Sequence, residues 1–262
     1  MFPLLSQNRL KFFQKLNQKK YRDREGLYII SGLRALQGAV SADNPEIETI
    51  IVAESRQSLL GQLNLRNSSI PVQLISEKDF AVLSDEKTPQ GICAILRKPE
   101  TVFKQQNIKE KLLFYFDRIN DPGNLGTVIR SAAWFGIKSI LLSPESADPF
   151  QPKAVRSSAG SITSMNIYEN VQKSDLMHLK KTGYRVYATN SDEGTNLDNL
   201  KSTDSAIIMM GSEAHGLDQN IFELADHRIS IARLGNGESL NLAIAASIIM
   251  FQATKTSAGG FK

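Results

Sequence analysis

Short, continuous apolar runs alternate with segments of helical pattern along this chain of 262 residues. A strand that is apolar at every position is typical of a parallel sheet with helices on both faces. In the second half of the chain, such runs predict strands at 112–116, 139–142, 184–188, 206–210 and 228–231. The helical patterns around them cover 125–135, 175–181 and 240–255. The expected fold class is therefore α/β with a mostly parallel sheet.

The first part of the chain repeats this alternation on a smaller scale. Apolar runs predict strands at 27–30, 49–53, 72–75 and 92–96. Helices are expected at 5–20, 32–40, 56–63 and 78–84. The polar segment that follows contains Pro99 and is typical of a linker. We therefore expect a small N-terminal α/β domain at 1–97, a linker at 98–110 and a larger domain at 111–262.

Three turns rich in glycine and asparagine follow strands of the second domain: Asn120–Gly126, Gly211–Gly216 and Gly235–Asn241. Each leads into a segment that can be read as helix. Open α/β sheets bind ligands at the carboxyl ends of their strands, so the three turns together predict one composite site. In the first turn, Asn124 is expected to be the N-cap of the next helix. Arg130 lies on the first turns of that helix and suits a phosphate or another anion.

The other two turns carry further candidates, each with a structural alternative. Glu213 comes soon after its strand, where it is either exposed at the sheet edge or held in a site. Gly211 and Gly216 allow a backbone path that side chains would block. Asn241 lies in the first turn of the last helix, where its amide can reach a ligand or satisfy a neighbouring loop. A plain turn or a capped helix explains each residue taken alone, and only their combination points to a site.

Several classes of protein are excluded or disfavoured. The Gly-x-x-x-x-Gly spacing at Gly211 lacks the Lys-Ser/Thr of a P-loop, and no Gly-x-Gly-x-x-Gly follows the first strand of either domain. Three histidines and one cysteine cannot form a Cys/His zinc site, and no metal is expected. No apolar run is long enough to span a membrane. The lone Cys93 is read as a buried strand thiol, and we expect a cytoplasmic protein.

Positive charge is concentrated at the start of the chain. The formal net charge is only +4, but Asp23 is the single acidic residue among the first 24. The basic residues of that segment are Arg9, Lys11, Lys15, Lys19, Lys20, Arg22 and Arg24. Such a cluster is typical of a surface that meets a polyanion such as nucleic acid. A solvated basic helix is the alternative.

The three turns together resemble the SpoU (TrmH-type) RNA ribose 2′-O-methyltransferases of the SPOUT superfamily. The specific strings are Asp-Pro-Gly-Asn-Leu-Gly from Asp121, the following Arg130, and Ser-Leu-Asn from Ser239. The first domain also resembles the N-terminal substrate-binding domain of that family, with Lys20-Tyr21-Arg22 near its opening. In two places the chain departs from the family pattern. Ala232-Arg233 replaces Pro-Met before the third turn, and Ser31-Gly32 replaces Glu-Gly after the first strand.

The resemblance implies a trefoil-knotted catalytic domain, a homodimer whose sites are completed across the interface, and S-adenosylmethionine as methyl donor. It implies that the donor is held around Gly211, Ile231 and Leu240. It also implies a polar catalytic set, which consists of Asn124, Arg130, Glu213, Ser239 and Asn241. RNA, most readily ribosomal RNA, is the implied substrate.

Two other functions stay open on the sequence. One is a catalytically inactive RNA-binding factor in ribosome assembly, and the other is an unrelated α/β enzyme that uses another nucleotide. Transfer RNA is the alternative to ribosomal RNA as substrate. The sequence holds no pattern that identifies the methylated nucleotide, because RNA is often recognised by its shape.

Overall fold

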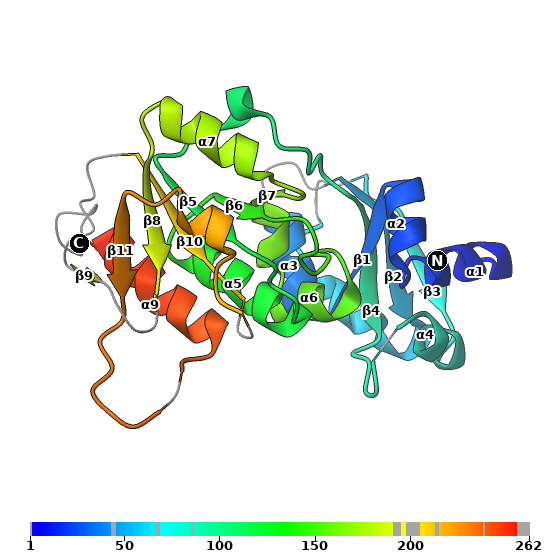
Figure 1. Cartoon of the computed structure of the whole chain (residues 1–262). Coiled ribbons are helices and arrows are strands. Elements are labelled where there is room, and N and C mark those ends of the chain that lie inside the picture. The colour runs from blue at the N-terminus through cyan, green and yellow to red at the C-terminus, as the bar shows by residue number, and fades with distance from the viewer. Residues whose placement is uncertain are drawn as a thin grey trace. The chain divides into compact units, whose positions relative to one another are not determined.

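The chain forms two compact units in a computed structural model (Figure 1). The first contains residues 1–99 together with 148–164, and the second contains 100–147 and 165–262. The structure describes residues 2–42, 46–65, 69–84, 86–190, 195–197, 205–212, 215–237 and 239–255.

The first unit is built on a sheet of four strands in the order β1-β4-β2-β3. Strand β4 is antiparallel to both β1 and β2, whereas β2 and β3 are parallel. The strands are β1 (Leu27–Ser31), β2 (Ile47–Ala53), β3 (Val72–Ile75) and β4 (Ile92–Arg97). The helices are α1 (Gln7–Lys15), α2 (Lys19–Glu25), α3 (Leu33–Ser41), α4 (Glu77–Leu83) and α6 (Pro152–Ser157), with short 3-10 segments at Glu54–Gln62 and Ser161–Ser164.

Alternate strand residues point to the two faces of this sheet, as the pleat requires. One face carries Ile51 and Cys93, which share a core with Leu10 and Phe13 of α1 and Phe80 of α4. Cys93 is buried there, as expected from the sequence. Burial raises the pKa of its thiol, with a further contribution from the charge of Glu86. A buried, protonated thiol of this kind is inert.

The basic helix expected over residues 5–20 is two helices. Helix α1 ends at Lys15, and α2 begins at Lys19 after the extended residue Gln18. Leu16 and Arg22 are both buried. On one straight helix these two side chains would point about 120° apart, at ~100° per residue. The break lets both of them reach the interior.

The segment 148–164 packs within the first unit. Arg22 forms a buried ion pair with Asp148, with 2.5 Å between Nη2 and Oδ2. Further along, Gly160 adopts a φ of +91°, and a Cβ there would lie 2.8 Å from the Cα of Ala35 in α3. Residues of two distant parts of the sequence therefore build one core.

The second unit contains a sheet of seven strands in the order β7-β6-β5-β10-β8-β11-β9. Every ladder in it is parallel, which confirms the expected fold class. The strands are β5 (Leu112–Phe116), β6 (Ser139–Leu142), β7 (Asn166–Tyr168), β8 (Arg185–Thr189), β9 (Thr195–Asn196), β10 (Ala206–Met210) and β11 (His227–Ser230). The helices are α5 (Pro122–Trp134), α7 (Lys173–Lys181), α8 (Gln219–Phe222) and α9 (Leu242–Lys255), with a 3-10 turn at Gln105–Asn107.

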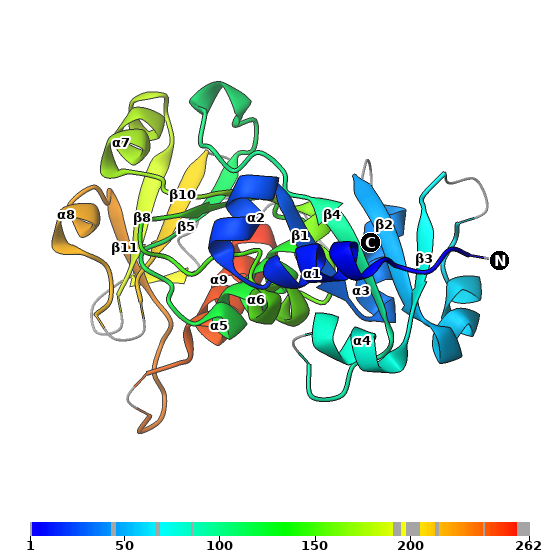
Figure 2. The same cartoon turned by 90° about the vertical axis from the view of Figure 1, so that its right-hand side faces the viewer.

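Helices cover both faces of this sheet. Figures 1 and 2 show α7 on one side and α5 with α9 on the other. Helices α5 and α9 lie side by side and run in the same direction. The hydroxyl of Ser247 donates to that of Ser131 at 2.7 Å, and the rings of Phe135 and Phe251 lie 6.0 Å apart. This pairing sets the start of α5 beside the start of α9.

Every strand expected from an apolar run is present, within two residues at each end. The shorter elements β7, β9, α6 and α8 were not predicted. The helix expected at 56–63 is instead a 3-10 segment without a buried residue. It has no apolar face to pack, and packing of such a face is what stabilises most helices in proteins.

Candidate functional site

A cavity of about 820 Å³ opens in the second unit at the carboxyl ends of β8, β10 and β11. Its wall includes Thr189 at the end of β8 and the following Asn190, Gly211 after β10 and Ile231 after β11. This is the edge at which a parallel sheet is expected to bind ligands. The second and third turns of the sequence therefore border one cavity.

The loop after β10 is closed by its own backbone. The N–H of Ser212 donates to the carbonyl of Gly216 at 3.1 Å, and the N–H of Gly216 donates back at 2.9 Å. A Cβ on Gly211 would lie 1.9 Å from the carbonyl carbon of Gly216 and 2.1 Å from the nitrogen of Leu217. Only glycine fits at position 211. Glu213, a candidate catalytic residue, lies outside the described residues.

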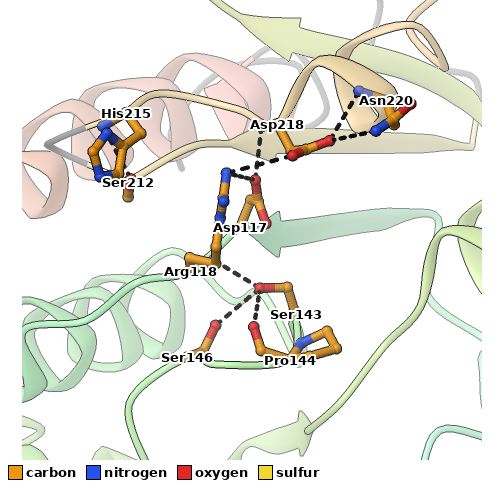
Figure 3. A network of polar contacts seen from close by, with 9 residues as sticks. All are labelled: Asp117, Arg118, Ser143, Pro144, Ser146, Ser212, His215, Asp218 and Asn220. Atoms are coloured by element: carbon orange, nitrogen blue, oxygen red, sulfur yellow. Dashed lines mark hydrogen bonds and ion pairs between the residues drawn. The ribbon is translucent and has the colours of Figure 1, made fainter.

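A polar network fixes the base of this loop (Figure 3). Asp117, which directly follows β5, is buried, and its Oδ2 accepts the N–H of Asp218 at 2.8 Å. The same oxygen lies 3.3 Å from Nη2 of Arg118, which is itself 3.9 Å from Oδ2 of Asp218. Asp218 also caps α8 through the N–H of Asn220 at 2.9 Å. Asp117 thereby ties the end of β5 to a segment that borders the cavity.

Arg118 connects the same network to the next strand of the sheet. Its φ is +52°, a conformation that non-glycine residues rarely adopt. In this conformation its N–H donates to Oγ of Ser143, which follows β6, at 2.7 Å. Ser143 in turn donates to the carbonyl of Pro144 at 2.9 Å. Bonds between side chain and backbone thus join the end of β5 to the residue after β6 and to the segment that follows the β10 loop.

No role for Asp117 or Arg118 follows from the sequence. The available signal was an acidic residue placed directly after a buried strand. That signal is weak, because carboxylates often follow strands at a solvated edge.

The N-cap of α5 is Asp121, not Asn124 as expected. The helix begins at Pro122, and Oδ1 of Asp121 accepts the N–H of Asn124 at 2.8 Å. Proline suits the first position of a helix, because its missing N–H has no partner to lose there. Asn124 is the third residue of the helix, within its first turn, and its side chain does not cap α5.

Asn124 is instead bonded to Asn241, so the first and third turns meet. Nδ2 of Asn241 donates to Oδ1 of Asn124 at 3.0 Å. The Oδ1 of Asn241 accepts the N–H groups of Ala243 at 3.0 Å and Ile244 at 3.3 Å, which caps α9. These acceptor bonds fix which end of the Asn241 amide faces Asn124.

The structure separates the candidate residues into three groups. Gly211, Ile231, Ser239 and Leu240 border the cavity. Asn124 and Asn241 form a pair at the starts of α5 and α9. Arg130 is exposed on α5, away from the cavity wall, and its side chain has no hydrogen bond or ion pair among the described residues.

No cluster of histidine, cysteine or acidic side chains that suits a metal ion is found in the described part of the chain. Within the same residues, no helix is both long and apolar enough to cross a membrane.

The family model of the SpoU rRNA methylases matches residues 111–251, which is more than half of the chain. The chain belongs to the SpoU rRNA methylase family. A second model, that of the MRM3-like substrate-binding domain, matches residues 7–94. The resemblance inferred from the three turns is thereby confirmed, together with a substrate-binding domain at the N-terminal side.

Individual members of the SpoU family match almost end to end. The chain is 30% identical to the 23S rRNA (guanosine(2553)-2′-O)-methyltransferase of Bacillus subtilis, over 93% of this chain and 94% of that protein. It is 27% identical to the 23S rRNA (uridine(2479)-2′-O)-methyltransferase of Streptomyces viridochromogenes, over 94% of this chain and 88% of that protein. The structure of an AdoMet-bound rRNA methyltransferase from Sinorhizobium meliloti superposes with a TM-score of 0.80 at 26% identity. The match covers 97% of this chain and 96% of that protein.

Proposed function

We propose that this chain transfers a methyl group from S-adenosylmethionine to a ribose 2′-hydroxyl of RNA, with ribosomal RNA as the substrate class. One observation carries the proposal. The three residues that the family resemblance assigns to the donor, Gly211, Ile231 and Leu240, border one cavity at the carboxyl edge of a parallel sheet. The relatives named above support the reaction and the substrate. We place the reaction in the cytoplasm, and the trefoil knot stays a prediction.

The cavity suits a ligand of the donor's size. Its volume of about 820 Å³ lies within the ~300–1,000 Å³ that is usual for small-molecule and cofactor sites. At Gly211 the wall is backbone, because no side chain fits there. Apolar side chains such as Leu242 and Ile249, from α9, also line the cavity. When bound, S-adenosylmethionine supplies a methyl group already activated by its sulfonium.

The polar residues then have to align the ribose hydroxyl with that methyl group. Alignment of two reactants can lower a barrier by ~7 kcal/mol or more. Ser239 is on the cavity wall, two residues before Asn241. The bond between Asn241 and Asn124 fixes this end of the third turn to α5. We assign to these three residues the positioning of the ribose.

Arg130 is assigned to the phosphate beside the target ribose. A role as general base would need a neutral guanidine group, whereas arginine stays protonated in proteins. A charged guanidinium next to the phosphate instead favours ionisation of the hydroxyl. The proton then leaves to solvent or to Glu213.

We further propose that two copies associate through α5 and α9. Large apolar side chains are exposed on these helices, with Trp134 84%, Ile244 54% and Phe251 40% exposed. Exposed apolar patches of this kind mark interaction sites. Arg130 lies four residues before Trp134 and therefore shares its face of α5. Covering Trp134 with a second copy would bring Arg130 to the interface, which explains why it lies away from the cavity of its own chain.

Methyl transfer from labelled S-adenosylmethionine tests the reaction. The acceptors are ribosomal RNA that lacks the modification and, in parallel, bulk transfer RNA. We expect label at one ribose of ribosomal RNA, in a linkage that resists alkali. Arg130→Ala and Arg130→Lys should both lose turnover while they still bind the donor in calorimetry. If Arg130→Lys turned over normally, the guanidinium would have no specific role.

The dimer is tested separately, by light scattering of the wild type and Trp134→Glu at micromolar concentration. A monomeric wild type would refute the shared site. If the wild type bound no donor and transferred no label, the methyltransferase proposal itself would fail.

A further inference from the structure

Two pairs of like charges lie on the exposed sides of α1 and α2. Lys11 and Lys15 are four residues apart in α1, and Lys20 and Arg24 have the same spacing in α2. All four side chains are exposed. Like charges at this spacing destabilise a helix by ~0.2–0.5 kcal/mol for each pair. A concentration of positive charge on one surface is typical of a site that meets a polyanion.

Three of these cations converge on one aromatic ring. Nζ of Lys15 lies 5.7 Å from the ring centroid of Tyr21, Nζ of Lys20 lies 4.9 Å away, and Cζ of Arg24 lies 5.0 Å away. A cation–π contact at an exposed site is worth only ~0.5–1 kcal/mol. The ring therefore gathers positive charge from two helices but does not neutralise it.

No carboxylate among the described residues forms an ion pair with Lys11, Lys15 or Lys20. Helix α2 holds two acidic residues. Glu25 forms an ion pair with Arg24, with 2.6 Å between Nη2 and Oε1, and Asp23 is engaged elsewhere. Its carboxylate lies 2.9 Å from Nζ of Lys98 and 3.3 Å from Nζ of Lys19. Partial burial opposes ionisation of Asp23, but these two lysines hold its pKa below the usual value.

The opposite sides of the two helices are fixed in the core. Leu10 and Phe13 of α1 are buried against the sheet, and Arg22 of α2 is bonded to Asp148. The helices that carry the exposed cations are consequently anchored on the core of the first unit. Because the apolar sides are already covered, these helices have no free apolar face with which to enter a membrane surface.

We propose that the basic helix surface, defined as Lys11, Lys15, Lys20, Tyr21 and Arg24, binds phosphates of the substrate RNA backbone. The inference rests on the proposed function and extends the RNA footprint to a defined surface of the first unit. Contacts of this kind position the RNA and do not read its sequence. They make affinity depend on salt, because bound phosphates release counterions.

The test is fluorescence anisotropy of a labelled 20-nucleotide RNA from 50 to 300 mM KCl. Lys15→Gln/Lys20→Gln removes two charges from the basic helix surface. Lys78→Gln/Lys87→Gln, a matched control, removes two exposed charges elsewhere in the same unit. The slope of log affinity against log salt should fall by about 1.4–1.8 in the first variant, at ~0.7–0.9 per phosphate contact. It should stay unchanged in the control.

Substitutions of Tyr21 separate the role of its ring from that of the surrounding positive charge. Tyr21→Phe should bind RNA like the wild type, whereas Tyr21→Leu should weaken binding because the lysines lose their common anchor. Equal slopes in the two double variants would overturn the inference, as would equal competition by polyglutamate, which would indicate an acidic protein partner. If ribosomal RNA were methylated while Lys15→Gln/Lys20→Gln bound RNA normally, only this inference would fail. If the wild type bound no RNA, the proposed function would fail with it.

Discussion

Replacement of Arg22 by methionine should destabilise the first unit strongly. The side chains of Arg22 and Asp148 are only 3% and 6% exposed. The guanidinium donates to Oδ2 of Asp148 from Nη2 at 2.5 Å and from Nε at 3.2 Å, and to the carbonyl of Leu16 from Nη1 at 2.7 Å. Without the guanidinium, the buried carboxylate of Asp148 is left with too few hydrogen-bond partners.

Loss of one partner from a buried pair costs about 3–5 kcal/mol, because the remaining charge stays desolvated. Lys19 cannot replace the guanidinium, since its Nζ is 4.0 Å from Asp148 and its side chain is 56% exposed. For a chain of this size, at ~2–4 °C per kcal/mol, the melting temperature should fall by roughly 6–20 °C. Arg22→Lys should be intermediate, because it keeps the charge but loses the planar fork.

Urea unfolding followed by circular dichroism measures these effects in a double-mutant cycle with Asp148→Asn. Asparagine keeps the Oδ1 that accepts the N–H of Phe150 at 2.8 Å. The double variant Arg22→Met/Asp148→Asn should lose less than the sum of the single variants, with a coupling of about 1–3 kcal/mol. Additive losses, or a loss under about 1 kcal/mol for Arg22→Met, would refute the reasoning.

Three further outcomes are expected. Gly211→Ala should weaken donor binding in calorimetry, because the new Cβ would lie 1.9 Å from the backbone of Gly216. Gly237→Ala should leave donor binding unchanged, because this position of the cavity wall has open space around it. Asp117→Ala should weaken donor binding about tenfold, since an unsatisfied N–H of Asp218 costs ~1–3 kcal/mol; normal affinity would remove Asp117 from the site. For Glu110, burial opposes ionisation, but hydrogen bonds led by that of Ser139 hold the pKa below its usual 4.5. In urea unfolding, the wild type should therefore be more stable than Glu110→Gln by its full margin above pH about 4.5. This margin should vanish at lower pH, as the carboxylate of Glu110 protonates. A margin that does not change with pH would contradict this.

The sheets could be predicted because their strands are apolar at nearly every position. Such runs cannot lie on a solvated surface, and helices between them leave a parallel order as the simplest arrangement. The meeting of Asn124 and Asn241 was predictable for a related reason. Turns after parallel strands lie on one edge of a sheet, although the sequence does not say which atoms will bond.

Other features depend on contacts between distant residues and leave no local pattern. Asp121 and Asn124 are both good capping residues, and the position of Pro122 decides between them only once the helix start is known. The positive φ of Arg118 is set by its bond to Ser143, 25 residues away. The exposure of Arg130 away from the cavity likewise depends on the packing of α5 against α9.

The Arg22–Asp148 pair joins residues 126 positions apart, and it makes the first unit discontinuous in sequence. The chain passes between its two units after residues 99, 147 and 164. A protease that cuts within 98–110 would therefore release neither unit, since two covalent crossings remain. Exchange of the first 97 residues with those of a relative would transplant an incomplete core. A complete first unit needs the N-terminal sheet together with residues 148–164, so Arg22 and Asp148 have to be exchanged together.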